Sequence, residues 1–336
     1  MNILISSVGR RNYIVDYFKS ALHGKSSVIV TNSIKDAAGM YVGDKAYVSP
    51  PILSPDYIPF LLDVCKKENI KAILPLFDLD VSAISFHKDE FLKENIFPIV
   101  ADYNVIKACF DKLDYPGLLH KAGIKTPKTY LDTEAAVEML DSGKLEFPLV
   151  LKPRWGTGSI STIIVKEKDQ LIYEFNRLAK GLLDSFLENP VPEGNKNQMI
   201  IQQFIKGDEF GMDVINDLNG NYVTTFVKKK LGMRSGETDG AITIKNEKYE
   251  MIGEKIGNLL KHIAILDVDF IVSETAEVYI IDMNPRFGGG YPFTHAAGVN
   301  LPAAIISWLM GESATDNYLK MADKILSVKG IALFTK

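Results

Sequence analysis

The first hundred residues alternate short apolar runs with segments of helical period. Residues 2–7 form an apolar run that ends before Gly9, and residues 12–22 then carry apolar side chains at helical spacing. The same alternation continues with strands expected at 28–31, 72–75 and 97–100 and helices at 55–68 and 80–92. Such an order is typical of a parallel sheet with helices on both faces. We therefore predict a doubly wound α/β domain over about residues 1–102.

The pattern changes after residue 104. Residues 104–122 have helical period, and Gly123 and Pro127 then mark a boundary. Two apolar runs around a Gly/Ser turn predict an antiparallel hairpin over 147–165, followed by a helix at 167–188. Later strands are expected near 199–205, 210–216, 221–228, 241–244, 268–273 and 277–282, with a helix at 248–264. This is an α+β pattern, and we divide the chain into a domain at 1–104, a linker helix at 105–124 and two lobes at 125–198 and 199–336.

Charge and hydropathy exclude several classes of protein. The net charge is −4, and Lys228–Lys230 is the one dense basic block, so the electrostatic footprint of a nucleic-acid binder is missing. No apolar run approaches the roughly 18 residues that span a bilayer, and Met1–Ile5 enter a strand without a signal-peptide pattern. We expect a cytoplasmic protein with small-molecule ligands, and neither nucleic acid nor membrane as a partner.

The stretch 267–290 contains the residues most suited to chemistry. Two strands joined by a tight turn would place Asp269 beside Asp282, with Asn284 on the same face. Oxygen ligands of this kind are those that Mg²⁺ prefers. The alternative is that Asp282 and Asn284 only cap a strand end, but acids among apolar residues are costly to bury unless paired or bound to metal. The sequence therefore predicts a magnesium site.

These residues resemble the metal-binding signature of ATP-grasp enzymes. The resemblance implies that Asp269, Asp282 and Asn284 hold one or two Mg²⁺ ions, for which Mn²⁺ can substitute, and that Arg286 stabilises the phosphate being transferred. The second acid of the family is usually Glu, so Asp282 is a departure. The likeness is to members of the carbamoyl-phosphate-synthase and pyrrolysine-biosynthesis types.

The resemblance extends upstream to an ATP site. Its implied members are the phosphate lysines Lys112 and Lys152, the phosphate turn of Gly156, Gly158 and Ser159, the adenine strand of Gln202, Gln203, Phe204 and Ile205, and the ribose carboxylate Glu209. Gln202 replaces a common Glu, and its amide oxygen can still accept from the adenine amino group. Taken alone, either lysine would more often be a solvated surface charge.

Substrate residues are expected on two other segments. In similar family members the loop 227–240 forms an active-site wall, in which Lys230 or Arg234 would meet anionic groups; an exposed hairpin is the alternative. Arg10 and Asp78 follow strands at the edge where open α/β sheets bind ligands. Arg10 could hold a carboxylate and Asp78 an amine, and a capping or domain-packing role is an equal alternative for each.

The resemblance implies a Rossmann-like pre-ATP-grasp domain, α/β in class, followed by a two-lobed α+β ATP-grasp domain. The function expected is ligation of a small carboxylate to an amine through an acyl phosphate, with ATP and Mg²⁺ as cofactors and ADP and phosphate as products. The alternatives are phosphorylation of bicarbonate or carbamate, and a non-catalytic nucleotide-binding regulatory protein. The identities of the substrates stay open, as does a homodimer.

Overall fold

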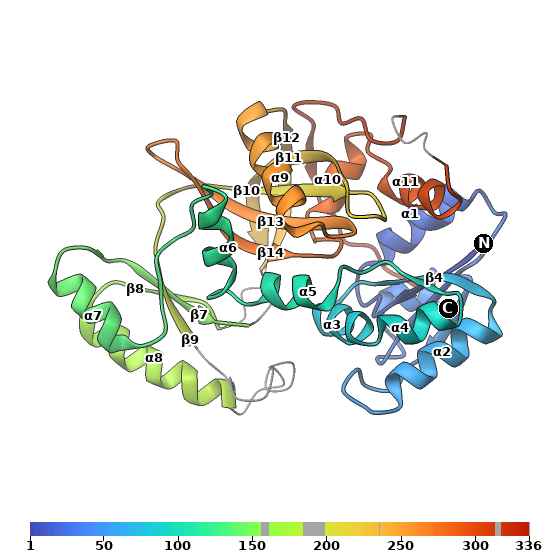
Figure 1. Cartoon of the computed structure of the whole chain (residues 1–336), viewed down its shortest axis with the longest axis horizontal. Coiled ribbons are helices and arrows are strands. Elements are labelled where there is room, and N and C mark those ends of the chain that lie inside the picture. The colour runs from blue at the N-terminus through green and yellow to red at the C-terminus, as the bar shows by residue number, and fades with distance from the viewer. Residues whose placement is uncertain (156–160, 184–198, 235, 313–316, 336) are drawn as a thin grey trace.

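The computed structural model describes residues 1–155, 161–183, 199–234, 236–312 and 317–335. The described residues form three sheets, of five, six and four strands. In Figure 1 the N-terminal domain lies at the right, the six-stranded sheet at the centre, and the four-stranded sheet with its two helices at the left. The predicted combination of an α/β domain and α+β lobes is confirmed.

The N-terminal sheet is parallel, with strand order β3-β2-β1-β4-β5. Its strands are β1 (Asn2–Ser6), β2 (Val28–Asn32), β3 (Lys45–Val48), β4 (Ile70–Pro75) and β5 (Phe97–Pro98), and its helices are α1 (Asn12–Leu22), η1 (Ala38–Tyr41), α2 (Tyr57–Lys67), α3 (Asp78–Phe86) and α4 (Lys88–Lys93). Ile3 and Ile5 pack in one apolar cluster and Leu4 in another, because successive strand residues point to opposite faces. Both faces are thus buried. Strand β3 is absent from the prediction because its side chains are largely exposed and carry no apolar run.

Two predicted helices are each broken in two. The helix expected at 80–92 divides at His87, between α3 and α4. The linker helix expected at 105–124 is wrong as one element, because α5 (Tyr103–Phe110) ends at Asp111, whose backbone is extended, and α6 (Tyr115–Lys121) begins after it. The Asp111 carboxylate accepts hydrogen bonds from Arg154 and from the backbone N–H of Leu113. This tertiary ion pair replaces the helical turn that the periodicity alone predicts.

The four-stranded sheet is antiparallel, in the order β6-β9-β7-β8. It consists of β6 (Thr129–Tyr130), β7 (Leu149–Pro153), β8 (Ile163–Val165) and β9 (Met199–Gln203), with α7 (Thr133–Asp141) and α8 (Lys168–Leu183) beside it. The predicted hairpin is confirmed by the pairing of Leu149 with Val165. Both side chains are fully buried in a cluster that includes Leu171 of α8.

The six-stranded sheet carries most of the polar side chains discussed below, and its order is β14-β13-β10-β11-β12-β15. Its elements are β10 (Gly207–Asn216), β11 (Tyr222–Arg234), β12 (Glu237–Ile244), β13 (Ala264–Ser273), β14 (Val278–Asn284) and β15 (Leu326–Val328), with α9 (Glu247–Leu260) packed on β10 and β11. Strands β11 and β12 reach further toward residue 235 than the sequence predicts. The extension matters because it brings Lys230 into a paired strand.

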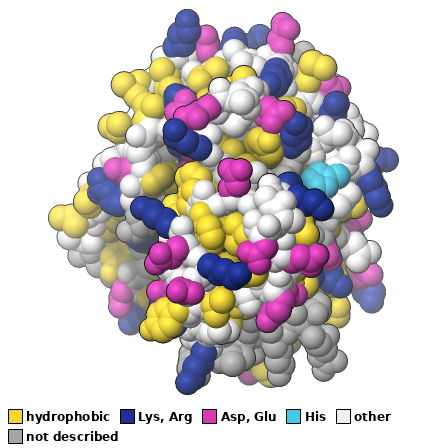
Figure 2. All heavy atoms as spheres, turned by 90° about the vertical axis from the view of Figure 1, so that its left-hand side faces the viewer, with side chains coloured by type: hydrophobic (Ala, Val, Ile, Leu, Met, Phe, Trp, Pro, Cys, Tyr) yellow, Lys and Arg dark blue, Asp and Glu magenta, His cyan; other side chains and the backbone are white. Residues whose placement is uncertain are grey.

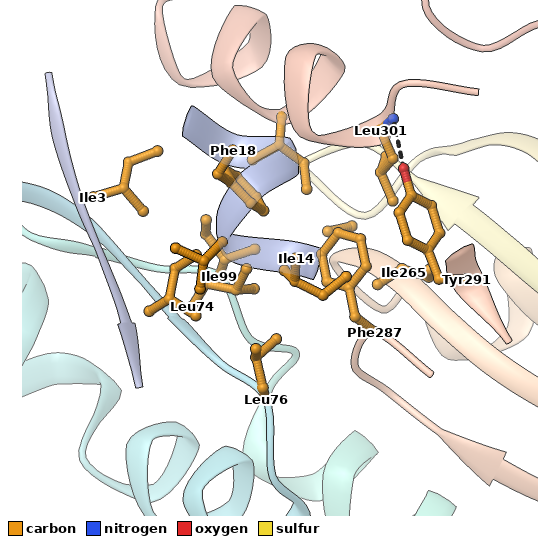
Figure 3. Close-up of a cluster of buried hydrophobic side chains, with 14 of the residues drawn as sticks. Ile3, Ile14, Phe18, Leu74, Leu76, Ile99, Ile265, Phe287, Tyr291 and Leu301 are labelled. Carbon is orange, nitrogen blue, oxygen red and sulfur yellow. Dashed lines mark hydrogen bonds between the residues drawn. The ribbon is translucent and has the colours of Figure 1, made fainter. Parts of the chain in front are cut away.

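The chain after β14 returns to the N-terminal domain. Helices α10 (Tyr291–Ala296) and α11 (Leu301–Leu309) follow, and Phe287 and Tyr291 join Phe18 of α1 in one buried cluster (Figure 3). The Tyr291 hydroxyl accepts a hydrogen bond of 3.0 Å from the backbone N–H of Leu301. Each fully buried large apolar side chain contributes about 1.5–3 kcal/mol. A shared core therefore fixes the N-terminal domain against the end of β14.

One face of the molecule has a surface of mixed charge. Figure 2 faces the side of α7 and α8 and shows acidic and basic side chains interspersed with apolar ones. None of the helices in the described part of the chain is long and apolar enough to cross a membrane.

Candidate active site

Four oxygen-bearing side chains lie on one face of the β13–β14 pair. Asp269 is opposite Asp282, and Asp267 is opposite Asn284. Directly paired residues of antiparallel strands share a face, and so do residues two apart on one strand. The predicted pairing of Asp269 with Asp282 is therefore confirmed, and Asp267 joins them as a residue that the sequence analysis missed.

Lysines from three other segments approach this face. The Nζ of Lys230 lies 2.8 Å from Oδ1 of Asp269 and 2.7 Å from Oε1 of Glu209. The Nζ of Lys112 lies 3.1 Å from Oδ1 of Asp282. Lys152 donates at 3.2 Å to the backbone oxygen of Ile281, next to Asp282. The structure thus brings the two predicted phosphate lysines together at one end of the acidic face.

The electrostatics at this end favour an anion. Burial and then the nearby charge of Lys112 outweigh Asp282 and Asp269 and lower the pKa of Lys152 to about 8. Burial raises the pKa of Asp282, but Lys112 and Lys152 outweigh it and hold the pKa below its usual range. For Lys230 burial lowers the pKa, while Asp269 and Glu209 outweigh it and raise the pKa above normal. Two crowded ammonium groups would gain from a polyanionic ligand such as a phosphate chain.

The donors present suit a hard divalent cation. In the described residues no three His, Cys, Asp or Glu side chains are grouped so as to hold a metal ion by themselves. The amide of Asn284, which donates to Oδ2 of Asp282 at 3.4 Å, would have to supply a further oxygen. Mg²⁺ is commonly held by one or two carboxylates together with phosphate oxygens and water, so Asp269, Asp282 and Asn284 fit it.

Asp267 depends on a glycine. A Cβ built on Gly288 would lie 2.1 Å from the carboxylate carbon of Asp267, so a side chain at position 288 cannot be accommodated without moving the acid. Burial and then Asp269 raise the pKa of Asp267 to about 7. The alternation Asp267-Val268-Asp269 was the signal that could have identified Asp267 as part of the face.

The acidic face forms the floor of a cleft of about 690 Å³ between the N-terminal domain and the six-stranded sheet. Its N-terminal wall includes Ser7, Arg10 and Asp78, and its opposite wall includes Lys228 and Lys230. The N-terminal wall lies where β1 and β4 end, as expected for ligand sites of open α/β sheets. The cleft is large enough for a small substrate beside a phosphate group.

Two predicted substrate residues have different surroundings. The Arg10 side chain is 84% exposed and lies 3.7 Å from Glu237, so it is accessible from the cleft. Both carboxylate oxygens of Asp78 instead accept hydrogen bonds from Arg286, at 2.5 and 3.3 Å. The structure therefore places Asp78 against the predicted phosphate-stabilising arginine, and its expected contact with a substrate amine stays a prediction.

The predicted nucleotide strand has mixed surroundings. Gln202 is buried, and its Nε2 donates at 3.0 Å to Oγ1 of Thr129. Phe204 and Ile205 follow β9, with Ile205 buried. The backbone N–H of Gln203 donates to the backbone oxygen of Lys128. The carboxylate of Glu209 accepts a hydrogen bond from Nζ of Lys230. Contacts of these residues with adenine and ribose stay predictions, and Gly156, Gly158 and Ser159 lie outside the described residues.

The basic block in β11 divides among three environments. Lys228 is buried and lies 2.7 Å from Asp213, Lys229 pairs with Asp208 at the surface, and Lys230 faces the acidic site. Arg234 is 63% exposed and bonds Asp239 at 2.7 Å. The structure thus brings Lys230, and not Arg234, to the acidic face. Strand alternation explains the difference between Lys229 and its neighbours.

Two segments of the chain match models of known protein families. Residues 109–290 match the family model described as ATP-grasp domain, and residues 3–99 match that described as the N-terminal domain of PylC-like proteins. The chain belongs to the ATP-grasp family. The ATP-grasp match contains Lys112, Lys152, Asp269, Asp282 and Arg286.

Curated relatives of this ATP-grasp chain include carbamoyl phosphate synthases. The large chain from Clostridium botulinum is 25% identical over 80% of this chain, which spans only 24% of that protein. A carbamoyl-phosphate synthase from Methanobrevibacter smithii is 23% identical, over 91% of this chain and 80% of its own length. The chain thus spans about a quarter of the length of the first of these relatives.

Solved structures share the ATP-grasp fold. The biotin carboxylase domain dimer of Hydrogenobacter thermophilus 2-oxoglutarate carboxylase, in complex with Mg-ADP, ADP and bicarbonate, superposes with a TM-score of 0.76 at 19% identity, over 93% of this chain and 70% of its own. N5-carboxyaminoimidazole synthetase from Staphylococcus aureus, complexed with ADP, gives 0.70 at 16% identity, over 97% of this chain and 79% of its own. At these identities the likeness establishes the fold alone.

Proposed function

We propose that this chain is an ATP-dependent carboxylate–amine ligase that activates its acid by phosphorylation. The observation that carries the proposal is that Lys112 pairs with Asp282, which lies opposite Asp269, and that Lys152 bonds the adjacent backbone oxygen of Ile281. This arrangement combines cations for a phosphate chain with oxygen ligands for a divalent ion. Phosphoryl transfer depends on such positioning and electrostatic stabilisation more than on covalent chemistry by the protein.

Each group has a task in this proposal. Lys112 and Lys152 bind the phosphates of ATP, and Arg286 stabilises the charge on the phosphoryl group in transfer. Asp269, Asp282 and Asn284 would hold Mg²⁺, which neutralises phosphate charge when bound. Phosphate oxygens would take over the contacts that the two lysines now make with Asp282 and with the backbone of Ile281.

The reaction proceeds in two balanced steps. A carboxylate oxygen of the acid attacks the γ-phosphorus, the bond to the β-phosphate oxygen breaks, and ADP leaves with the electron pair. The amine nitrogen then attacks the acyl carbon, phosphate leaves, and the nitrogen loses a proton as the amide forms. Arg10, the exposed cation of the cleft, is proposed to hold an anionic group of a substrate.

A second candidate is phosphorylation of bicarbonate or carbamate. It is favoured by the Methanobrevibacter relative, named carbamoyl-phosphate synthase, of which this chain covers 80%. The same lysines and oxygen ligands would serve, because the phosphoryl acceptor is again a carboxylate oxygen. Only the acceptor separates the two candidates.

Product analysis tests both candidates. Purified protein is incubated with Mg-ATP and single amino acids or other small acids, with and without hydroxylamine, and a parallel series contains bicarbonate. The proposal expects ADP and phosphate with the correct acid and a hydroxamate when the amine is withheld. AMP and pyrophosphate would contradict it, and ADP formation that requires only bicarbonate would favour the second candidate.

Two finer properties complete the proposal. The biotin carboxylase domain with a similar fold is a dimer, and on this basis we propose that the present chain forms a homodimer. Light scattering of the purified protein would report its mass directly. A cytoplasmic location also stays a prediction.

A further inference from the structure

Arg286 is held from the N-terminal domain. Its Nε donates to Oδ1 of Asp78 at 2.5 Å and its Nη2 donates to Oδ2 at 3.3 Å. The side chains of Arg286 and Asp78 are 9% and 7% exposed. Two parallel bonds between a guanidinium and a carboxylate fix the direction of the arginine as well as its place.

The geometry also directs the far end of the guanidinium. With Nε and Nη2 facing Asp78, the Nη1 lies 3.6 Å from Oδ2 of Asp267, which shares the face of β13 with Asp269. Nη1 also donates to the backbone oxygen of Phe287 at 3.3 Å. The Nη1 end of Arg286 therefore lies beside Asp267 in the acidic floor of the cleft.

Backbone structure alone would not hold Arg286 there. It lies after the end of β14 at Asn284 and before the start of α10 at Tyr291, in a segment without regular structure. Asp78, by contrast, begins α3, directly after β4 and its loop. A carboxylate at the start of a helix therefore faces an arginine on a loop.

Arg11 fixes the two segments to each other. Its Nη1 donates to the backbone oxygens of Leu76 and Phe287, at 2.5 and 2.6 Å. Leu76 is two residues before Asp78, and Phe287 is the residue after Arg286. The loops that carry the anion and the cation are thus joined next to the pair itself.

We propose that Asp78 is a positioning residue that orients Arg286 for phosphoryl transfer, so that the N-terminal domain takes part in the chemical step. This inference rests on the proposed function. It assigns Asp78 to the enzyme's own arginine instead of a substrate amine. A simple latch between domains would also need the ion pair, but would not need Arg286 to face the cleft in one orientation.

The test compares a ground-state ligand with a mimic of the transferring phosphoryl group. Binding of Mg-ADP, and of Mg-ADP with aluminium fluoride, is measured by calorimetry for the wild type, for Asp78→Asn and for Asp102→Asn. Asp102 is a matched control, because its carboxylate accepts from Lys88 in the same domain and is 80% exposed. Thermal unfolding of all three proteins is followed in parallel.

We expect the three proteins to bind Mg-ADP with affinities within about twofold of one another. Aluminium fluoride should increase the affinity for Mg-ADP, and this enhancement should fall by roughly tenfold or more in Asp78→Asn only, since bonds between charged groups are involved. An unchanged or larger enhancement in Asp78→Asn would overturn the proposal, as would a parallel loss of Mg-ADP affinity and thermal stability. A wild type that binds Mg-ADP with no enhancement would overturn the proposed function as well, which separates the two failures.

Discussion

Asp111 and Arg154 form a buried ion pair with two parallel hydrogen bonds, of 2.7 and 2.6 Å. Lys112 follows Asp111, and Lys152 is two residues before Arg154. The backbone N–H of Lys112 also donates to the oxygen of Arg154 at 3.2 Å. The pair therefore joins the segment between α5 and α6 to strand β7 and sets the separation of the two proposed phosphate lysines.

Arg154→Met should destabilise the protein by about 3–5 kcal/mol, because it leaves the Asp111 carboxylate buried without its cation. Urea denaturation measures the free energy of unfolding. The matched control is Lys168→Met, which removes an exposed ion pair with Asp141 and should cost about 0–1 kcal/mol. Equal losses in the free energy of unfolding of the two variants would show that the buried ion pair stabilises the protein no more than the exposed one.

Nucleotide binding should take up a proton near Lys152. Because its pKa is about 8, much of the Lys152 side chain is the neutral amine at pH 8.5, whereas phosphate oxygens favour the charged ammonium form. Calorimetric titration with Mg-ADP at pH 8.5 in two buffers of different ionisation enthalpy measures the uptake. Lys152→Arg keeps its charge at this pH and should abolish the uptake. An uptake that persists in this variant would assign the proton to another group.

Asp282→Asn should abolish Mg²⁺-dependent ATP turnover and leave the fold intact. The variant keeps the shape of the side chain but removes a charge opposite Asp269, and a neutral amide is a poorer ligand for Mg²⁺. Binding of Mn²⁺ in the presence of ADP can be measured by electron paramagnetic resonance. Glu274→Gln, which removes an exposed carboxylate paired with Lys206, serves as control. Full turnover by Asp282→Asn would remove this residue from the metal site.

The stability of the N-terminal domain should depend on pH through the titration of Asp80. Burial raises the pKa of this carboxyl to about 6 in the folded protein, although Ser6 and Tyr57 donate to it at 2.6 and 2.7 Å. A raised folded pKa means that the unfolded chain loses its proton first, so this group's contribution to stability is present below about pH 4 and falls as pH rises through about 6. Asp80→Asn removes the effect, and its free energy of unfolding relative to wild type should rise by up to about 3 kcal/mol between pH 4 and 7.5.

Asp44 provides a control of opposite sign for this experiment. Burial raises its pKa, but hydrogen bonds from Lys19 and from the backbone N–H of Val28 outweigh it and lower the pKa. Its contribution to stability is present above the unfolded pKa and is lost as pH falls. Asp44→Asn should therefore become less stable relative to wild type as pH rises from about 3 to 5. A profile for Asp44→Asn that rises with pH, parallel to that of Asp80→Asn, would contradict the assignment of Asp44.

The local pattern of the sequence determined the class of the fold and one part of the site. Apolar runs of strand length between helical segments were enough for the parallel N-terminal sheet, because strand and helix bury their faces with different periods. A tight turn between two strands also fixed the register that pairs Asp269 with Asp282, since side chains repeat every two residues. Family resemblance added the two lysines, which are distant from these acids in sequence.

Only the tertiary structure decided how charged residues distant in sequence are partnered. Helical period gave one linker helix, whereas the pairing of Asp111 with Arg154 breaks it in two. Asp78 and Arg286 are 208 positions apart, and no local pattern relates them. An ion pair of this kind depends on where whole domains meet. Apolar packing around residues such as Phe18 and Phe287 determines that meeting point. Periodicity shows only which face of its own element a residue occupies.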